Sequence, residues 1–142
     1  MTTATTNARG LTRRSTLAAM TAAAAARPTL AAAKEYGPGV TDTEIKIGQT
    51  IAYSGPAAML GVSGRSAIAY YKMINDKGGV NGRKITLISA DDSYAPPKTV
   101  EQTRRLVEQE GVLGMFGSIG AGTNASAQKY LNDRKVPQFF VL

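Results

Sequence analysis

The sequence predicts an α/β protein built on an open parallel sheet with helices on both faces. Short apolar, β-branched runs alternate along the chain with longer stretches of helical periodicity, in the order β-α-β-α-β-α-β. Only a few residues connect each run to the next. Because parallel strands need a crossover between them, usually a helix, this alternation favours a parallel sheet covered on both sides.

The first strand and helix are marked by two different hydrophobic periods. Residues 43–52 (TEIKIGQTIA) predict a strand, because isoleucines alternate in a β-branched run that a turn at 54–56 (SGP) ends. Residues 58–76 predict a helix, whose apolar face has residues at offsets 0, 1, 4 and 7 from Ala67. The glycine pair at 78–79 ends this helix.

The second strand is predicted over residues 84–90 (KITLISA), and the acidic pair Asp91-Asp92 follows it. The proline pair Pro96-Pro97 then begins a second helix, at positions where a missing N–H group is tolerated. A carboxylate shortly before a helix commonly accepts its first amides. We therefore expect one of the two aspartates to cap the second helix.

The last part of the sequence repeats the pattern and stops within a strand. Residues 112–116 predict a short third strand, and a glycine-rich loop at 117–123 (GSIGAGT) precedes a third helix over about 124–133. Residues 136–142 begin a fourth strand, where the sequence ends. Parallel strands are normally buried on both faces, so we expect the chain to be a fragment with an incomplete sheet.

Residues 1–33 predict a cleavable export signal, separate from the mature part at 34–142. A basic start that ends at Arg13-Arg14 precedes an apolar stretch over 17–26 and small residues at 31–33. As a helix the apolar stretch would span about 15 Å, half of a bilayer core, so we expect no membrane anchor here. The arginine pair resembles a twin-arginine signal. The alternative, an amphipathic helix of the mature protein, lacks the required 3.6-residue period.

Composition excludes several classes of function. Four of the 17 basic residues are arginines of residues 1–33, which leaves 13 against 10 acids, a net charge of only +3 for the remainder. This gives no basic patch for nucleic acid. The chain has no histidine and no cysteine, so it cannot form a Ser-His or Cys-His nucleophile, a thiolate metal site or a lipid-anchored N-terminal cysteine. We expect a protein that is not an enzyme and that uses no metal and no cofactor.

The predicted topology brings three loops to one edge of the sheet. Ligands of open α/β sheets bind beyond the carboxyl ends of the strands, where residues 53–61, 91–97 and 117–123 lie. The glycines of the third loop leave amides free for an anion, and the helix after it adds a positive end. Ser118 and Thr123 could add hydroxyl donors. The pattern predicts a carboxylate site, although a tight turn that needs glycine for packing is an equal alternative.

Several sequence blocks occur in a fixed order over residues 38–142. They are 39–48 (GVTDTEIKIG), 54–56 (SGP), 74–83 (INDKGGVNGR), Asp91-Asp92 with Pro97, and 129–131 (KYL) followed by 136–138 (VPQ). In this order and spacing, the chain resembles the branched-chain amino acid substrate-binding proteins of ABC transporters, which are type I periplasmic binding proteins.

The resemblance implies a flavodoxin-like fold of two α/β lobes that hold an amino acid in the cleft between them. Closure of the lobes presents the ligand to an ABC permease in the membrane, without covalent chemistry. Residues 34–142 would supply the first part of lobe one, located in the periplasm. Because half of the cleft would be absent, we expect this part to bind its ligand weakly or not at all.

The resemblance also assigns ligand-binding residues. The 117–123 loop would hold the carboxylate through backbone amides and a hydroxyl, with Gly120 at a position where a serine is common and Leu60 where an aromatic residue is common. The expected ligand-binding residues are Ser54, Leu60, Ser118, Gly120, Ala121 and Thr123. Two alternatives stay open: the same fold binding an amide, urea or aromatic acid, or a ligand-sensing domain of a receptor.

Overall fold

The structure is a computed structural model that describes Met1 and residues 34–142. The export signal expected over residues 1–33, with its arginine pair and cleavage site, lies outside the described residues apart from Met1. Residues 35–142 pack together as one unit.

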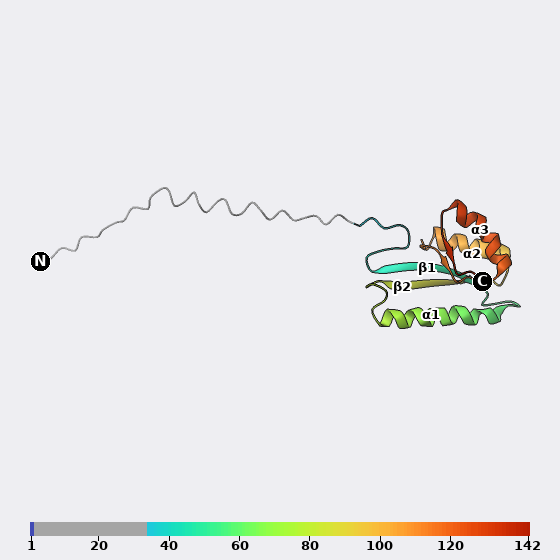
Figure 1. Ribbon diagram of the computed structural model, residues 1–142, viewed down its shortest axis with the longest axis horizontal. Coiled ribbons are helices and arrows are strands. Elements are labelled where there is room, and N and C mark those ends of the chain that lie inside the picture. Colours follow the sequence, from blue (N-terminus) through green and yellow to red (C-terminus); the bar gives the residue numbers. More distant parts are fainter. Residues whose placement is uncertain (2–33) are drawn as a thin grey trace. The chain divides into compact units, whose positions relative to one another are not determined.

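Four parallel strands form one sheet in the order β2-β1-β3-β4 (Figure 1). The strands are β1 (Glu44–Ile51), β2 (Lys84–Asp91), β3 (Met115–Phe116) and β4 (Gln138–Phe139). The helices are a 3-10 turn (Ala58–Leu60), α1 (Gly61–Asp76), α2 (Pro96–Glu108) and α3 (Ala121–Asp133). The open parallel sheet predicted from the sequence is confirmed.

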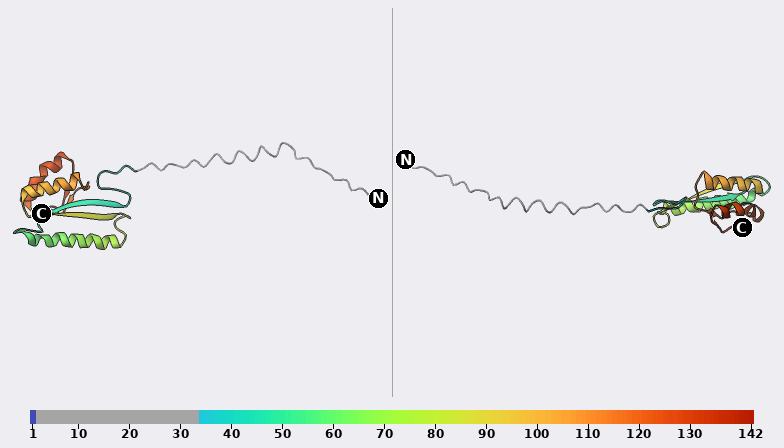
Figure 2. Two further views of the ribbon diagram at one scale, coloured as in Figure 1. Left: turned by 180° about the vertical axis from the view of Figure 1, so that it is seen from behind. Right: turned by 90° about the horizontal axis from the view of Figure 1, so that it is seen from above.

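Helices cover both faces of the sheet, as predicted. Helix α1 lies along β2 on one side, and α2 and α3 lie together on the other side of β1 (Figure 1). The first view in Figure 2 shows the same arrangement from behind. The close approach of α1 depends on Gly64, where a Cβ atom would collide with the Tyr53 hydroxyl and press on Ile51. The opposite face holds the buried core, formed by Ala90, Leu106, Val112, Met115, Ala127 and Leu131.

The third and fourth strands are shorter than predicted, with two residues each. Left-handed backbone at Gly117 (φ 67°) turns the chain out of β3, and Phe140 (φ 50°) does the same after β4. A residue in that conformation cannot continue a strand ladder. β3 therefore ends at Phe116, where the sequence predicted, and differs only in beginning at Met115. β4 ends at Phe139, although the apolar pattern continues to Leu142.

Helix α3 begins earlier than predicted, at Ala121. Gly120 has φ 129°, a value that side chains rarely allow, and it turns the chain directly into the helix. The second half of the glycine-rich loop is thus the first turn of α3. Among the helices of the described part, none is both long and apolar enough to cross a membrane.

Candidate ligand site at the carboxyl edge of the sheet

The three loops that follow β1, β2 and β3 meet at the carboxyl edge, as the topology predicts. The Ser54 and Ser93 hydroxyl oxygens, from the first and second loops, lie 2.7 Å apart. The ring of Tyr94, from the second loop, lies against Gly120 of the third. The structure therefore forms one continuous surface from loops that are distant in sequence.

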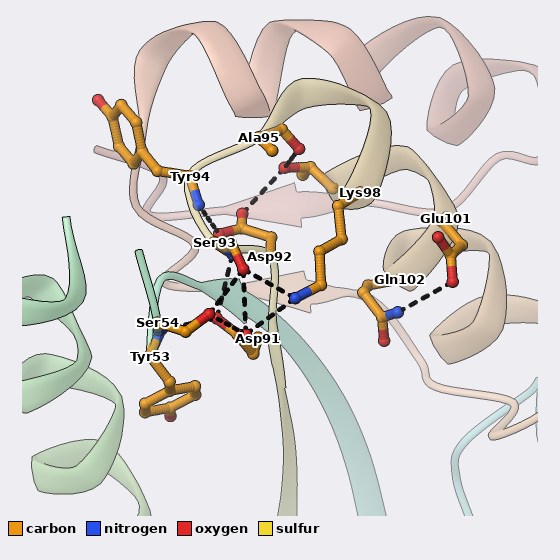
Figure 3. A network of polar contacts seen from close by, with 11 residues as sticks. Tyr53, Ser54, Asp91, Asp92, Ser93, Tyr94, Ala95, Lys98, Glu101 and Gln102 are labelled. Atoms are coloured by element: carbon orange, nitrogen blue, oxygen red, sulfur yellow. Dashed lines mark hydrogen bonds and ion pairs between the residues drawn. The ribbon is translucent and has the colours of Figure 1, made fainter. Parts of the chain in front are cut away.

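The Asp91 carboxylate holds the first two of these loops together (Figure 3). Its Oδ1 atom accepts the amides of Tyr53, Ser54 and Ser93 at 2.8, 3.1 and 3.0 Å. Its Oδ2 atom accepts the Ser54 and Ser93 hydroxyls at 2.6 and 3.2 Å and the Lys98 ammonium at 2.9 Å. Sequence analysis did not single out this role, because the donors lie on three separate segments.

These contacts fix the ionisation state of Asp91. Desolvation alone would raise its pKa, but the hydrogen bonds from Ser54 and Lys98 and from the amides of Tyr53 and Ser93 outweigh it and hold the pKa far below its usual range. Asp91 is therefore a carboxylate at any physiological pH, and its acceptor capacity is taken up by groups of the protein.

Neither Asp91 nor Asp92 caps α2, contrary to the prediction that one of them would. The N-cap residue is Ala95, and no side chain bonds the first amides of the helix. The reason is that Pro96 and Pro97 have no N–H group to offer. The buried Asp92 carboxylate instead accepts the Tyr94 amide and the Thr99 hydroxyl, each at 2.9 Å, and so fixes the second loop to the first turn of α2.

Two glycine amides of the 117–123 loop are used within the protein. The Gly117 amide donates to the Phe139 carbonyl at 3.0 Å, and the Gly120 amide donates to the Leu142 carbonyl at 2.6 Å. Gly120 itself cannot carry a side chain here, because a Cβ atom would collide with the Thr123 hydroxyl. The expectation that the glycines of this loop leave their amides free for a ligand therefore does not hold for Gly117 and Gly120.

The free donors lie in the first turn of α3. Within the described part of the chain, the amides of Ala121, Gly122 and Thr123 donate no hydrogen bond, as is normal for the first turn of a helix. Ala121 and Gly122 are exposed, and a Cβ atom added at Gly122 would meet nothing within 4 Å. Thr123 itself is buried, so the Ala121 and Gly122 amides form the open, positively polarised surface suited to a carboxylate.

Neither hydroxyl expected to assist them points to this surface. Ser118 is fully buried, and its oxygen accepts the Thr50 amide at 3.1 Å, which replaces a ladder bond between β1 and the departing β3. The buried Thr123 donates its hydroxyl to the Gly120 carbonyl at 2.9 Å. Both hydroxyls support the shape of the loop, so the two expected roles are corrected.

The two predicted residues of the first loop differ in surroundings. Ser54 is exposed and belongs to the Asp91 network, whereas Leu60 is half-buried at the end of the 3-10 turn that leads into α1. Tyr94 was missed by sequence analysis altogether. The sequence signal that could have indicated it was its position in residues 91–97, the second of the three loops at the carboxyl edge.

Comparison with known proteins identifies the family. A family model described as "Periplasmic binding protein" matches residues 44–141, which is most of the chain. The chain belongs to this family. The relationship inferred from the sequence blocks is thereby confirmed.

Relatives of this periplasmic binding protein include the "Leu/Ile/Val-binding protein homolog 7" of Brucella abortus, 36% identical over 109 residues. The match covers 76% of this chain but only 27% of that relative, so the chain spans about a quarter of its length. These are proteins named for binding, in agreement with the expectation of a protein that is not an enzyme.

Two solved structures show the same architecture. The branched-chain amino acid substrate-binding protein LivJ from Streptococcus pneumoniae, in complex with isoleucine, aligns with a TM-score of 0.62 and 28% identity over 68% of this chain and 28% of its own. A solute-binding protein of an ABC transporter from R. palustris, in complex with benzoate, aligns with a TM-score of 0.58 and 28% identity over 67% of this chain and 26% of its own.

Proposed function

We propose that the chain belongs to an extracytoplasmic solute-binding component of an ABC importer. It binds branched-chain or related amino acids and delivers them to a permease in the membrane. One observation carries the proposal: the first turn of α3 presents the exposed amides of Ala121 and Gly122, without acceptors in the described part of the chain, at the edge where the loops converge.

The chemistry of this turn favours an acidic group. Amides at a helix N-terminus carry partial positive charge, and several together can bind a carboxylate without a lysine or arginine. The exposed Ala121 and Gly122 leave room for the group to approach. In this proposal the ligand carboxylate binds at Ala121 and Gly122, and Leu60 and Ser54 belong to the opposite wall.

The relatives support an amino acid as the first candidate. Their names describe binding of leucine, isoleucine and valine, and one solved structure holds isoleucine. The benzoate complex of the R. palustris protein favours an aromatic acid as the second candidate. The two classes share a carboxylate and differ in the group attached to it.

Export completes the proposal. Residues 1–33 act as a cleavable signal of the twin-arginine type, and the mature protein works in the periplasm without a lipid anchor. Sequencing the N-terminus of the protein recovered from the periplasmic fraction tests this part. A mature N-terminus at Lys34 is the expected result, and an intact residue 1 in the exported protein would contradict it.

A titration followed by nuclear magnetic resonance tests the binding site. The 142-residue chain, labelled with ¹⁵N, is titrated with leucine, isoleucine, valine and benzoate, and with leucinamide as a matched compound without the carboxylate. We expect saturable shifts of the 121–123 amides with the acids and none with leucinamide. Equal shifts with leucinamide, or no saturable shift with any acid up to 200 mM, would overturn the carboxylate site.

A further inference from the structure

Tyr94 has an unusual backbone for a large side chain. Both Ser93 and Tyr94 adopt left-handed conformations, with φ of 52° and 60°. For a bulky residue such a conformation is a true outlier, and outliers of this kind concentrate at functional sites. Glycine or asparagine would adopt it with less strain, so a requirement for the ring itself is the simplest reason for a tyrosine here.

The surrounding structure forces this conformation on the loop. The Asp91 carboxylate accepts the Ser93 amide at 3.0 Å, and the Asp92 carboxylate accepts the Tyr94 amide at 2.9 Å. The Ala95 amide closes the turn on the Asp92 carbonyl at 2.9 Å. Two successive aspartates, one of them completely buried, thus hold the Tyr94 backbone in place from both sides.

The ring of Tyr94 is fixed beside the proposed carboxylate site. Its Cε2 atom would lie 2.9 Å from a Cβ atom at Gly120, so the ring packs on the residue that precedes the free amides of α3. Figure 3 shows the ring turned away from the Asp91 network. The side chain remains 45% exposed, and within the described part its hydroxyl makes no hydrogen bond to the protein.

We propose that Tyr94 is a specificity-determining residue of the ligand site. A carboxylate bound at Ala121 and Gly122 would place the group attached to it next to the exposed part of the Tyr94 ring. An aromatic face there favours acids that carry an apolar group, such as the side chain of leucine or the ring of benzoate, over small acids without one. This inference rests on the proposed carboxylate site and names its selectivity.

The variant Tyr94→Gly separates a binding role from a structural one. Glycine adopts the left-handed backbone without strain, so we expect the variant to keep or raise the Tm of the 142-residue chain. Its affinity for benzoate and leucine, measured from the shifts of the 121–123 amides, should fall about three- to tenfold, the range expected for loss of an aromatic contact. Its affinity for acetate should change less than twofold.

Two further variants serve as controls, and a third is held as a substitute. Tyr94→Phe keeps the ring and should keep the affinities within twofold. Tyr70→Ala removes a tyrosine of α1 that is also exposed, at 56% against 45% for Tyr94, and should leave the affinities within twofold. If Tyr94→Gly does not fold, Tyr94→Asn takes its place, because asparagine also tolerates this backbone.

The outcomes are distinguishable. Saturable shifts at 121–123 with unchanged benzoate and leucine affinities in Tyr94→Gly would overturn the role of Tyr94 and leave the carboxylate site standing. An equal loss of affinity for acetate would also overturn it, because the effect would then concern the carboxylate and not the attached group. Absence of saturable shifts with every acid would overturn the proposed site and this inference together.

Discussion

The Oδ2 atom of Asp91 and the Nζ atom of Lys98 lie 2.9 Å apart and join the end of β2 to the first turns of α2. The pair is partly exposed, with 30% of the Asp91 side chain and 38% of the Lys98 side chain accessible. Because the same carboxylate also accepts amides from both adjacent loops, it organises the surface on which the candidate site lies.

Replacing Asp91 should destabilise the fold. In Asp91→Ala the amides of Tyr53, Ser54 and Ser93 and the Lys98 ammonium lose their shared acceptor. Solvent can reach part of this cluster, so we expect a loss of about 1–3 kcal/mol in the free energy of unfolding, measured by urea denaturation.

The exposed pair of Asp133 and Lys129 provides a matched control. It also joins an aspartate carboxylate to a lysine ammonium, at 2.7 Å, within one helix. Asp133→Ala should change the free energy of unfolding by less than about 0.5 kcal/mol. Equal effects of the two substitutions would contradict the organising role of Asp91.

Stability should depend on pH through Asp91. Its pKa in the folded chain lies below the ordinary value of about 4 for an unfolded aspartate. A group with a depressed folded pKa stabilises the fold above its unfolded pKa, and this contribution is lost as the pH falls through the folded pKa. The free energy of unfolding should therefore decrease below about pH 4, and Asp91→Asn should show a smaller decrease over the same range in thermal melts.

Ser118→Ala should reduce stability and leave ligand selectivity unchanged. The substitution removes the acceptor of the buried Thr50 amide, and an unsatisfied buried donor costs about 1–3 kcal/mol. Ser63→Ala, on the exposed side of α1, serves as the control and should have little effect. If Ser118→Ala instead kept full stability and lost affinity for acids, the serine would be a ligand contact.

Ala121→Pro should weaken binding of acids without breaking α3. Proline suits the first position of a helix and removes only one amide donor there, as the prolines at the start of α2 illustrate. We expect affinity for leucine or benzoate to fall about three- to tenfold, in line with the loss of one hydrogen bond to a charged group. Ala125→Ser, on the exposed surface of the same helix, is the control, and affinity that is equal in both variants would contradict the amide site.

The 142-residue chain should bind leucine with a Kd no tighter than millimolar. The described residues offer amides for the carboxylate, and the chain spans only about a quarter of the length of the relatives it matches. Isothermal titration calorimetry measures this directly. A Kd in the micromolar range or below would contradict the view that these residues supply only part of the cleft.

The sequence predicted the elements well because their signals are local. The isoleucine alternation predicted β1 to within one residue at each end, and the proline pair predicted the start of α2 at Pro96. The lengths of β3 and β4 were overestimated. β3 begins only at Met115, and the left-handed backbone at Phe140, of which apolar composition carries no sign, ends β4.

The sequence predicted the location of the candidate site at the carboxyl edge, but only some of the residues that form it. The loop at 117–123 was recognised, but its two hydroxyls point inward. The Ser118 hydroxyl oxygen accepts the Thr50 amide, and the Thr123 hydroxyl donates to the Gly120 carbonyl. Asp91 and Tyr94 were not recognised as parts of the site, because their roles depend on contacts between segments about 25 to 40 residues apart.

The internal neutralisation of Asp91 has a kinetic consequence. A free carboxylate at the mouth of the site would repel an approaching anion and slow its association. Because the Lys98 ammonium balances the charge and amides of both loops bond the carboxylate, an incoming acid meets little electrostatic barrier. Its association rate should therefore vary only weakly with ionic strength.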